Sequence, residues 1–79
     1  MNDESAKTVI GVSYHFRVRR KITTYETAAF DGLSLTTVER YLVDKGYKRA
    51  KDNPDMSIRY TKRVDRNAYT AFVAVENEL

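Results

Sequence analysis

Apolar and polar residues alternate along the stretch Val9–Thr24, as they do in a strand with one buried face. The even positions are apolar: Ile10, Val12, Tyr14, Phe16 and Val18. The odd positions between them are polar or basic: Ser13, His15, Arg17 and Arg19. This period of two predicts a half-buried strand from about Thr8 to Arg19, with one apolar face and one basic face.

The next segment, Ile22 to Phe30, is rich in Thr and Tyr and suits a second strand. Between Gly11 and Asp31, however, the chain contains none of the usual turn residues Gly, Asn, Asp and Pro. Two interpretations stay open. Either residues 19–21 form a tight turn, or one long, bent strand projects as an arm. We favour the hairpin.

A helix is predicted from about Leu35 to Lys45. Its apolar positions recur at spacings of three and four and form one stripe: Leu35, Val38, Tyr41 and Leu42. Ser34 or Thr36 can cap the start of the helix, and Thr36 with Glu39 matches a capping box. Gly46 is the expected left-handed residue just past the end.

Three further strands are predicted after the helix: Tyr47–Ala50, Met56–Val64 and Ala68–Val75. Turns are predicted at Asp52–Asp55 and at Asp65–Asn67. The last strand is apolar on both faces, so it is either central in the sheet or uses its second face to form a homodimer.

These elements predict an α+β fold in the order β-β-α-β-β-β, with a mostly antiparallel sheet and one helix packed on one face. With 79 residues, the chain has room for one small domain over residues 8–79. Residues 1–7 lack apolar periodicity and are expected to form a loose, flexible tail.

Composition excludes several classes of site. The chain has no cysteine, which excludes disulfides and thiolate metal sites, and the single histidine cannot build a histidine metal site alone. We expect no cofactor. No stretch approaches the roughly 18 apolar residues of a membrane span, so we expect a cytoplasmic protein without membrane contact.

Catalysis has little support because the chain contains no glycine-rich phosphate loop and no HExxH motif. His15 with Glu26 or Asp31 across a hairpin could form a general base for an RNase-like reaction. We interpret His15 instead as an exposed strand residue among basic neighbours, and we predict a non-catalytic protein.

Positive charge is concentrated in the middle of the chain. The formal net charge is +3, but residues 17–66 contain 13 lysines and arginines against seven acids, an excess of +6. If the first strand and the strand around residue 60 share a sheet, their basic side chains meet on one open surface. The predicted contacts with a nucleic acid or an acidic partner are Arg17, Arg19, Arg20, Lys21, Arg59 and Arg63, with His15, Tyr25 and Tyr47 as secondary contacts.

The first function hypothesis is nucleic-acid binding through phosphates, with aromatic side chains stacking on unpaired bases. The second is a protein-interaction module, such as a small inhibitor or adaptor of the mobile-element type that docks on a larger host protein. A third interpretation is that the charges only keep a half-exposed sheet soluble and protect it from edge pairing.

The order of helix, Gly46-Tyr47, short strand, turn and strand over residues 37–75 resembles the order in HicA-type toxins and in double-stranded-RNA-binding folds. HicA-type toxins carry a catalytic histidine early in the strand region after the helix. The corresponding stretch here, Met56-Ser57-Ile58-Arg59, contains no histidine. The resemblance therefore implies no toxin activity.

Overall fold

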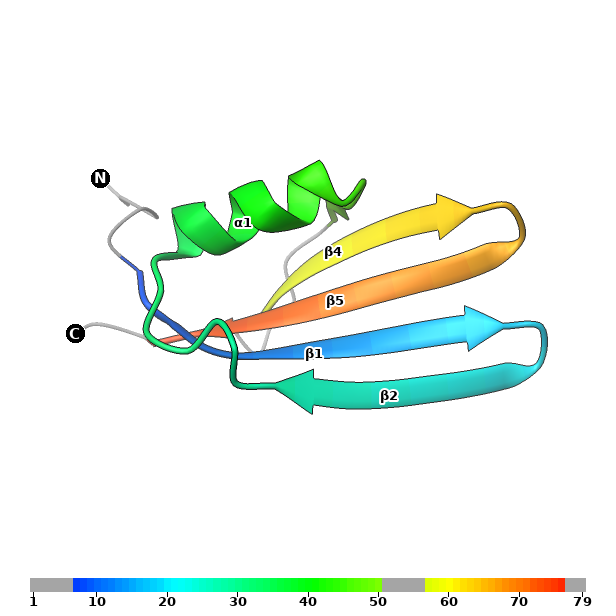
Figure 1. Ribbon diagram of the computed structural model, residues 1–79, viewed down its shortest axis with the longest axis horizontal. Coiled ribbons are helices and arrows are strands. Elements are labelled where there is room, and N and C mark those ends of the chain that lie inside the picture. The colour runs from blue at the N-terminus through cyan, green and yellow to red at the C-terminus, as the bar shows by residue number, and fades with distance from the viewer. Residues whose placement is uncertain (1–6, 51–56, 77–79) are drawn as a thin grey trace.

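A computed structural model describes residues 7–50 and 57–76, which form one five-stranded sheet with a helix on one face (Figure 1). The elements are β1 (Val9–Val18), β2 (Lys21–Thr27), α1 (Leu35–Asp44), β3 (Lys48–Arg49), β4 (Ser57–Val64) and β5 (Asn67–Val75). All neighbouring strands are antiparallel, and their order across the sheet is β2-β1-β5-β4-β3. The predicted α+β fold is confirmed, and β5 is central in the sheet.

The hairpin interpretation of residues 8–30 is correct. β1 and β2 pair continuously from Val18 opposite Lys21 to Val12 opposite Thr27, so β2 ends before Phe30. The turn has two residues, and the first of them, Arg19, adopts the left-handed conformation with φ of 58°. Short hairpin turns need positive φ because only that backbone twist matches the flanking strands. Arg19 therefore adopts the positive φ of the turn, although it is not one of the usual turn residues.

The hairpin between β4 and β5 is built in the same way. Val64 pairs with Asn67, and the first of the two turn residues, Asp65, has φ of 57°. The two hairpin turns lie side by side at one end of the sheet (Figure 1). We call this end, residues 17–21 and 62–66, the distal end.

The N-cap of the helix is one of the two residues that the sequence predicted. Ser34 is the N-cap, and its Oγ accepts a hydrogen bond of 3.2 Å from the backbone N–H of Thr37. The expected capping box at Thr36 is wrong, because Glu39 reaches across to the sheet and accepts a hydrogen bond of 2.6 Å from the Tyr60 hydroxyl. Gly46, with φ of 97°, follows the helix as predicted.

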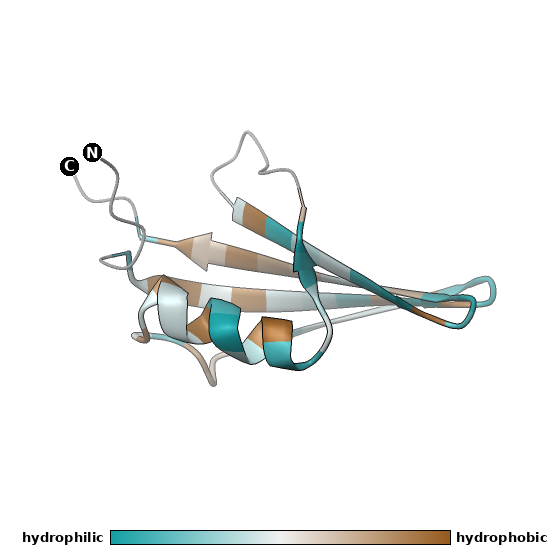
Figure 2. Ribbon diagram, turned by 90° about the horizontal axis from the view of Figure 1, so that it is seen from above, coloured by the Kyte–Doolittle hydropathy of each residue, from teal (hydrophilic) through white to brown (hydrophobic). Residues whose placement is uncertain are grey.

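The core lies between α1 and the helix-facing side of the sheet. Its buried residues are Val9, Val12, Tyr14, Leu35, Val38, Leu42, Tyr47, Ile58, Tyr60, Ala71 and Val73. The helix covers only the half of the sheet away from the distal end, where both hairpins project beyond it (Figure 1). Val18 and Val64, at the strand ends nearest the turns, remain 42% and 48% exposed. Figure 2 shows that the projecting turns are hydrophilic.

Most of the predicted N-terminal tail and the predicted turn at Asp52–Asp55 lie outside the described residues. Lys7 is the described part of that tail, and its carbonyl oxygen accepts a hydrogen bond of 2.9 Å from the N–H of Leu35. This bond ties the segment before β1 to the start of α1. None of the helices in residues 7–50 and 57–76 is long and apolar enough to cross a membrane.

Candidate functional site

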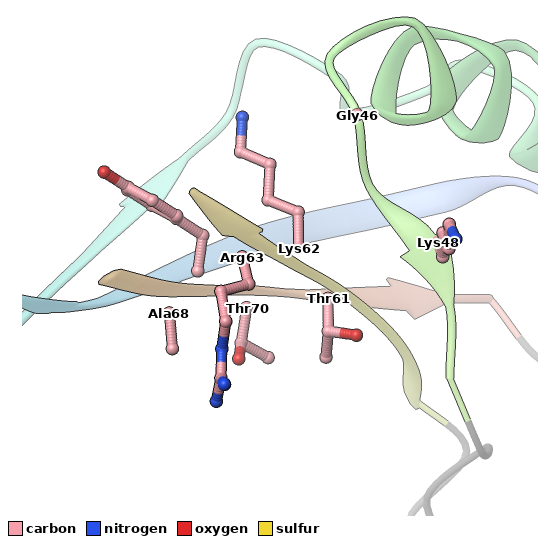
Figure 3. A pocket seen from close by; sticks show the side chains of 8 residues that line it. Gly46, Lys48, Thr61, Lys62, Arg63, Ala68 and Thr70 are labelled. Carbon is pink, nitrogen blue, oxygen red and sulfur yellow. The ribbon is translucent and has the colours of Figure 1, made fainter. Parts of the chain in front are cut away.

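The sheet face opposite the helix, which we call the open face, brings together arginines from both hairpins. Arg17 of β1 and Arg63 of β4 each pair with Ala68 of β5, so the three side chains form one row across three strands. Neighbouring strands lie about 4.8 Å apart, which puts the Cα atoms of the two arginines roughly 10 Å apart. In Figure 3, Arg63 and Ala68 point to one side of the sheet and Lys62 to the other.

The next row holds the only histidine. His15 pairs with Thr24 on one side and Thr70 on the other. Its Nδ1 lies 3.0 Å from the Thr24 hydroxyl oxygen, within hydrogen-bond distance. Its ring meets the Phe72 ring edge-on, with centroids 4.9 Å apart and planes at 89°. His15 is thus held in place by two neighbours, one polar and one aromatic.

Arg59 completes the site from β4, where it pairs with Phe72. Its side chain is partly buried, and its Nε is shielded from solvent without a hydrogen-bond partner among the residues that the structure describes. A buried donor left without an acceptor costs roughly 1–3 kcal/mol.

These rows surround a hollow of about 380 Å³ on the open face. Its floor is formed by the two small side chains Ala68 and Thr70, and Phe72, Arg17 and Arg59 stand around it. A second hollow of about 450 Å³ lies at the edge of β4 and also includes Ala68 and Thr70 (Figure 3). The two hollows share Ala68 and Thr70, and the second one also includes Lys62 and Tyr69 of the helix-facing side.

The distal end carries the excess charge of the chain. Residues 17–21 and 62–66 contain seven lysines and arginines against one aspartate, a net charge of +6. This equals the whole excess of residues 17–66, whose remaining six basic and six acidic residues cancel. Hairpin folding therefore places two basic stretches, separated in the sequence by the helix, at one end of the molecule.

The basic side chains at the distal end remain available for a ligand. Six of them make no ion pair with any residue in the described part of the chain: Arg17, Arg19, Arg20, Lys21, Arg63 and Arg66. Lys62 differs, because it points to the helix side and donates a hydrogen bond of 2.9 Å to the carbonyl oxygen of Lys45. Outside the distal end, Arg49 of β3 lies with its Nη1 3.5 Å from the Glu39 carboxylate.

Most of the predicted site residues converge, but not all on one face. Arg17, Arg59 and Arg63 share the open face with His15, as their alternation predicted. Arg19 was expected on that face and instead lies with Arg20 in the turn, because β1 ends at Val18. Lys21 pairs with Val18 and so belongs to the helix-facing side.

The two predicted stacking tyrosines do not lie on the open face. Tyr47 is only 5% exposed, so its prediction as an exposed aromatic contact is wrong. It is buried beneath Lys62, whose Nζ lies 4.7 Å from the ring centroid. Tyr25 is 48% exposed but lies on the helix-facing side, stacked 5.2 Å from Tyr14. The aromatic ring beside the arginines is Phe72, which pairs with Arg59 and shares the hollow with Arg17.

The helix-facing side carries a cluster of tyrosines that adds no charge to the site at neutral pH. Burial raises the pKa of Tyr14 from 10.0 to about 12, and neighbouring tyrosines add to the shift. Burial likewise raises the pKa of Tyr47. Both phenols therefore stay protonated, and the distal end keeps its full positive charge.

No family model matches this chain, and no curated protein or solved structure matches it. The charge, register and contacts of the described residues define a basic, open and partly apolar surface.

Proposed function

We propose that this protein binds nucleic acid through the distal end and the adjoining open face. The observation that carries the proposal is the gathering, at one end of the sheet, of six basic side chains that form no ion pair with residues 7–50 or 57–76. Guanidinium groups recognise phosphate oxygens in a bidentate manner, and cations that neutralise phosphates release counterions. Contacts of this kind favour nucleic acids of any sequence.

The spacing of the arginines supports contact with more than one phosphate. Arg17 and Arg63 stand on either side of Ala68, roughly 10 Å apart at their Cα atoms. Nucleic-acid strands carry one charge per 3.4 Å of helix axis. Two side chains at this spacing therefore reach separate phosphates of one strand, and the arginines of the turns extend the contact beyond the sheet.

We propose a binding protein rather than a nuclease. The hydrogen-bonding neighbour of His15 is the Thr24 hydroxyl, not Glu26 or Asp31. Glu26 pairs with Ser13, one row away on the same face. A histidine without a carboxylate to orient it is poorly placed to act as a general base.

The test is binding of labelled single- and double-stranded DNA and RNA, measured by fluorescence anisotropy across a salt series. Six phosphate contacts would give a slope of log K against log salt of about −4 on a single strand, so we expect a value between about −2 and −4. Arg17→Glu should weaken binding about tenfold or more. Arg40→Glu, the same change on the exposed side of the helix, is the matched control and should change affinity less than about threefold, since salt screens distant charges.

The proposal fails if there is no binding at low salt, or if binding is indifferent to salt. In that case the second candidate is favoured, a small inhibitor or adaptor that docks on an acidic protein surface. One observation supports this candidate: Ile22, beside Arg17 on the open face, is 66% exposed. Exposed apolar side chains next to charge are common where proteins bind each other.

A further inference from the structure

The hollow on the open face is more than a basic surface, because one of its walls is an oriented aromatic ring. Phe72 is half-buried, and its ring is perpendicular to the neighbouring His15 ring, with the two planes at 89°. His15 in turn lies within hydrogen-bond distance of Thr24. The ring is thus held in one orientation by β1 and β2. Aromatic rings held in this way provide stacking surfaces for the bases of nucleic acids.

The wall next to Phe72 carries hydrogen-bond donors. Arg59 is the cross-strand neighbour of Phe72, and its half-buried side chain lines the hollow. Arginine has donors in a fixed planar fork and no acceptor of its own. Base edges present acceptors that match this fork, such as O6 and N7 of guanine. A base beside Phe72 would meet both a stacking surface and a donor.

The size and charge of the hollow limit its occupant. Its volume of about 380 Å³ lies near the lower end of the range for small-ligand sites, roughly 300–1,000 Å³. None of its lining residues is acidic, and Glu26 lies in the same row as Arg59 but three strands away. The hollow therefore suits a small planar ring that belongs to a negatively charged molecule. It does not suit a cation.

We infer that the hollow takes one unpaired base of a single-stranded nucleic acid, stacked on Phe72, while Arg17 and Arg63 hold the flanking phosphates. This inference rests on the proposed function and names the form of nucleic acid that the site prefers. A base within a duplex is stacked and paired on both sides, so it enters such a hollow only if it is first flipped out. The site therefore selects single strands over duplexes.

The experiment compares three labelled ligands of equal length in fluorescence anisotropy with the unmodified protein. They are a single strand, its duplex, and the same single strand with several consecutive abasic positions, which keeps the phosphates but removes bases. We expect the single strand to bind about tenfold more tightly than the abasic strand and the duplex. Equal affinity for the intact and abasic strands would overturn the inference.

Variants of the protein give a second, independent readout. Phe72→Leu removes the aromatic face but keeps an apolar side chain, and should lower single-strand affinity about tenfold while duplex affinity stays within twofold. Tyr25→Leu, an exposed aromatic on the other side of the sheet, is the matched control and should change neither affinity. Equal weakening of single strand and duplex by Phe72→Leu would count against a base in the hollow.

The two proposals fail in different ways. If all three ligands bind with equal, salt-dependent affinity, the distal end binds phosphates and the inference about the hollow is wrong. If none of them binds at low salt, the proposed function itself is wrong, and the inference falls with it. Circular dichroism of Phe72→Leu separates a loss of fold from a loss of binding, and the abasic ligand needs no variant at all.

Discussion

Ala68→Glu is the sharpest test of the site, because it inserts a carboxylate between the two arginines of one row. Ala68 pairs with Arg17 on one side and Arg63 on the other. Directly opposite Cβ atoms lie about 4.5–5.5 Å apart, so the new carboxylate reaches both guanidinium groups. The variant should therefore neutralise two phosphate contacts with a single substitution.

The size of the effect follows from the geometry. Two unit charges about 5 Å apart attract by roughly 0.8 kcal/mol in water and roughly 3 kcal/mol at an effective dielectric constant of 20. Both arginines are exposed, so the value for each pair lies toward the lower end. Losing two phosphate contacts should lower affinity on the order of 100-fold and reduce the salt slope by about 1.4 on a single strand.

Two matched variants make the result interpretable. Ala68→Gln has nearly the same shape as Ala68→Glu but no charge, so it should fill the hollow and keep most of the salt-dependent affinity. Ala74→Glu places the same charge on the same face of β5, six residues or about 20 Å away. This distance exceeds the Debye length of about 8 Å at physiological salt, so affinity should change less than about twofold.

The assay is anisotropy across a salt series, with thermal unfolding measured in parallel. Cross-strand ion pairs contribute roughly 0.2–1 kcal/mol, so Ala68→Glu should unfold at the same temperature as the parent or slightly higher. Equal loss of affinity in Ala68→Glu and Ala74→Glu would refute the assignment of Arg17 and Arg63 as the contacts, because only net charge would then matter.

Three further predictions concern the scaffold. Tyr60→Phe removes the hydrogen bond to Glu39 and should lower the free energy of unfolding by about 1–2 kcal/mol in urea titrations, whereas Tyr41→Phe, at an exposed tyrosine of α1, should change it by less than about 0.5 kcal/mol. Arg19→Gly removes the strain of a left-handed residue at φ 58°, and this gain exceeds the cost of the greater conformational entropy of the unfolded chain. The free energy of unfolding should therefore rise by about 0.5–1 kcal/mol. Because burial raises the pKa of Tyr14 from 10.0 to about 12, stability should be full below pH 10 and fall as pH rises through 12, and Tyr14→Phe should remove the ultraviolet absorbance step near pH 12. A Tyr14→Phe titration that matches the parent would contradict this last assignment.

Local pattern determined much of this fold. The alternation in β1 and β4 predicted which side chains share a face, because successive residues of a strand point to opposite sides whatever the strand pairs with. The stripe of α1 and the cap at Ser34 were readable for the same reason, since they depend on residues within one or two turns. The sequence therefore predicted one basic face on β1, around Arg17, and another on β4, around Arg59.

Only the tertiary structure decided how these faces combine. The placement of Ala68 between Arg17 and Arg63, and of Phe72 beside Arg59, depends on the register of β1 and β4 against β5. Residues that meet across strands are distant in the sequence, and no local preference encodes which of them meet.

The same reason explains the errors at Arg19 and Tyr47. Arg19 lies in a turn because strand pairing on both sides holds it in a left-handed conformation that its own preference opposes. Tyr47 is buried because Tyr14 and Lys62 close over it from other strands. The sequence by itself determined which side chains are basic and which way each strand presents them. The pairing of the two hairpins decided that these charges meet at one end, around a hollow.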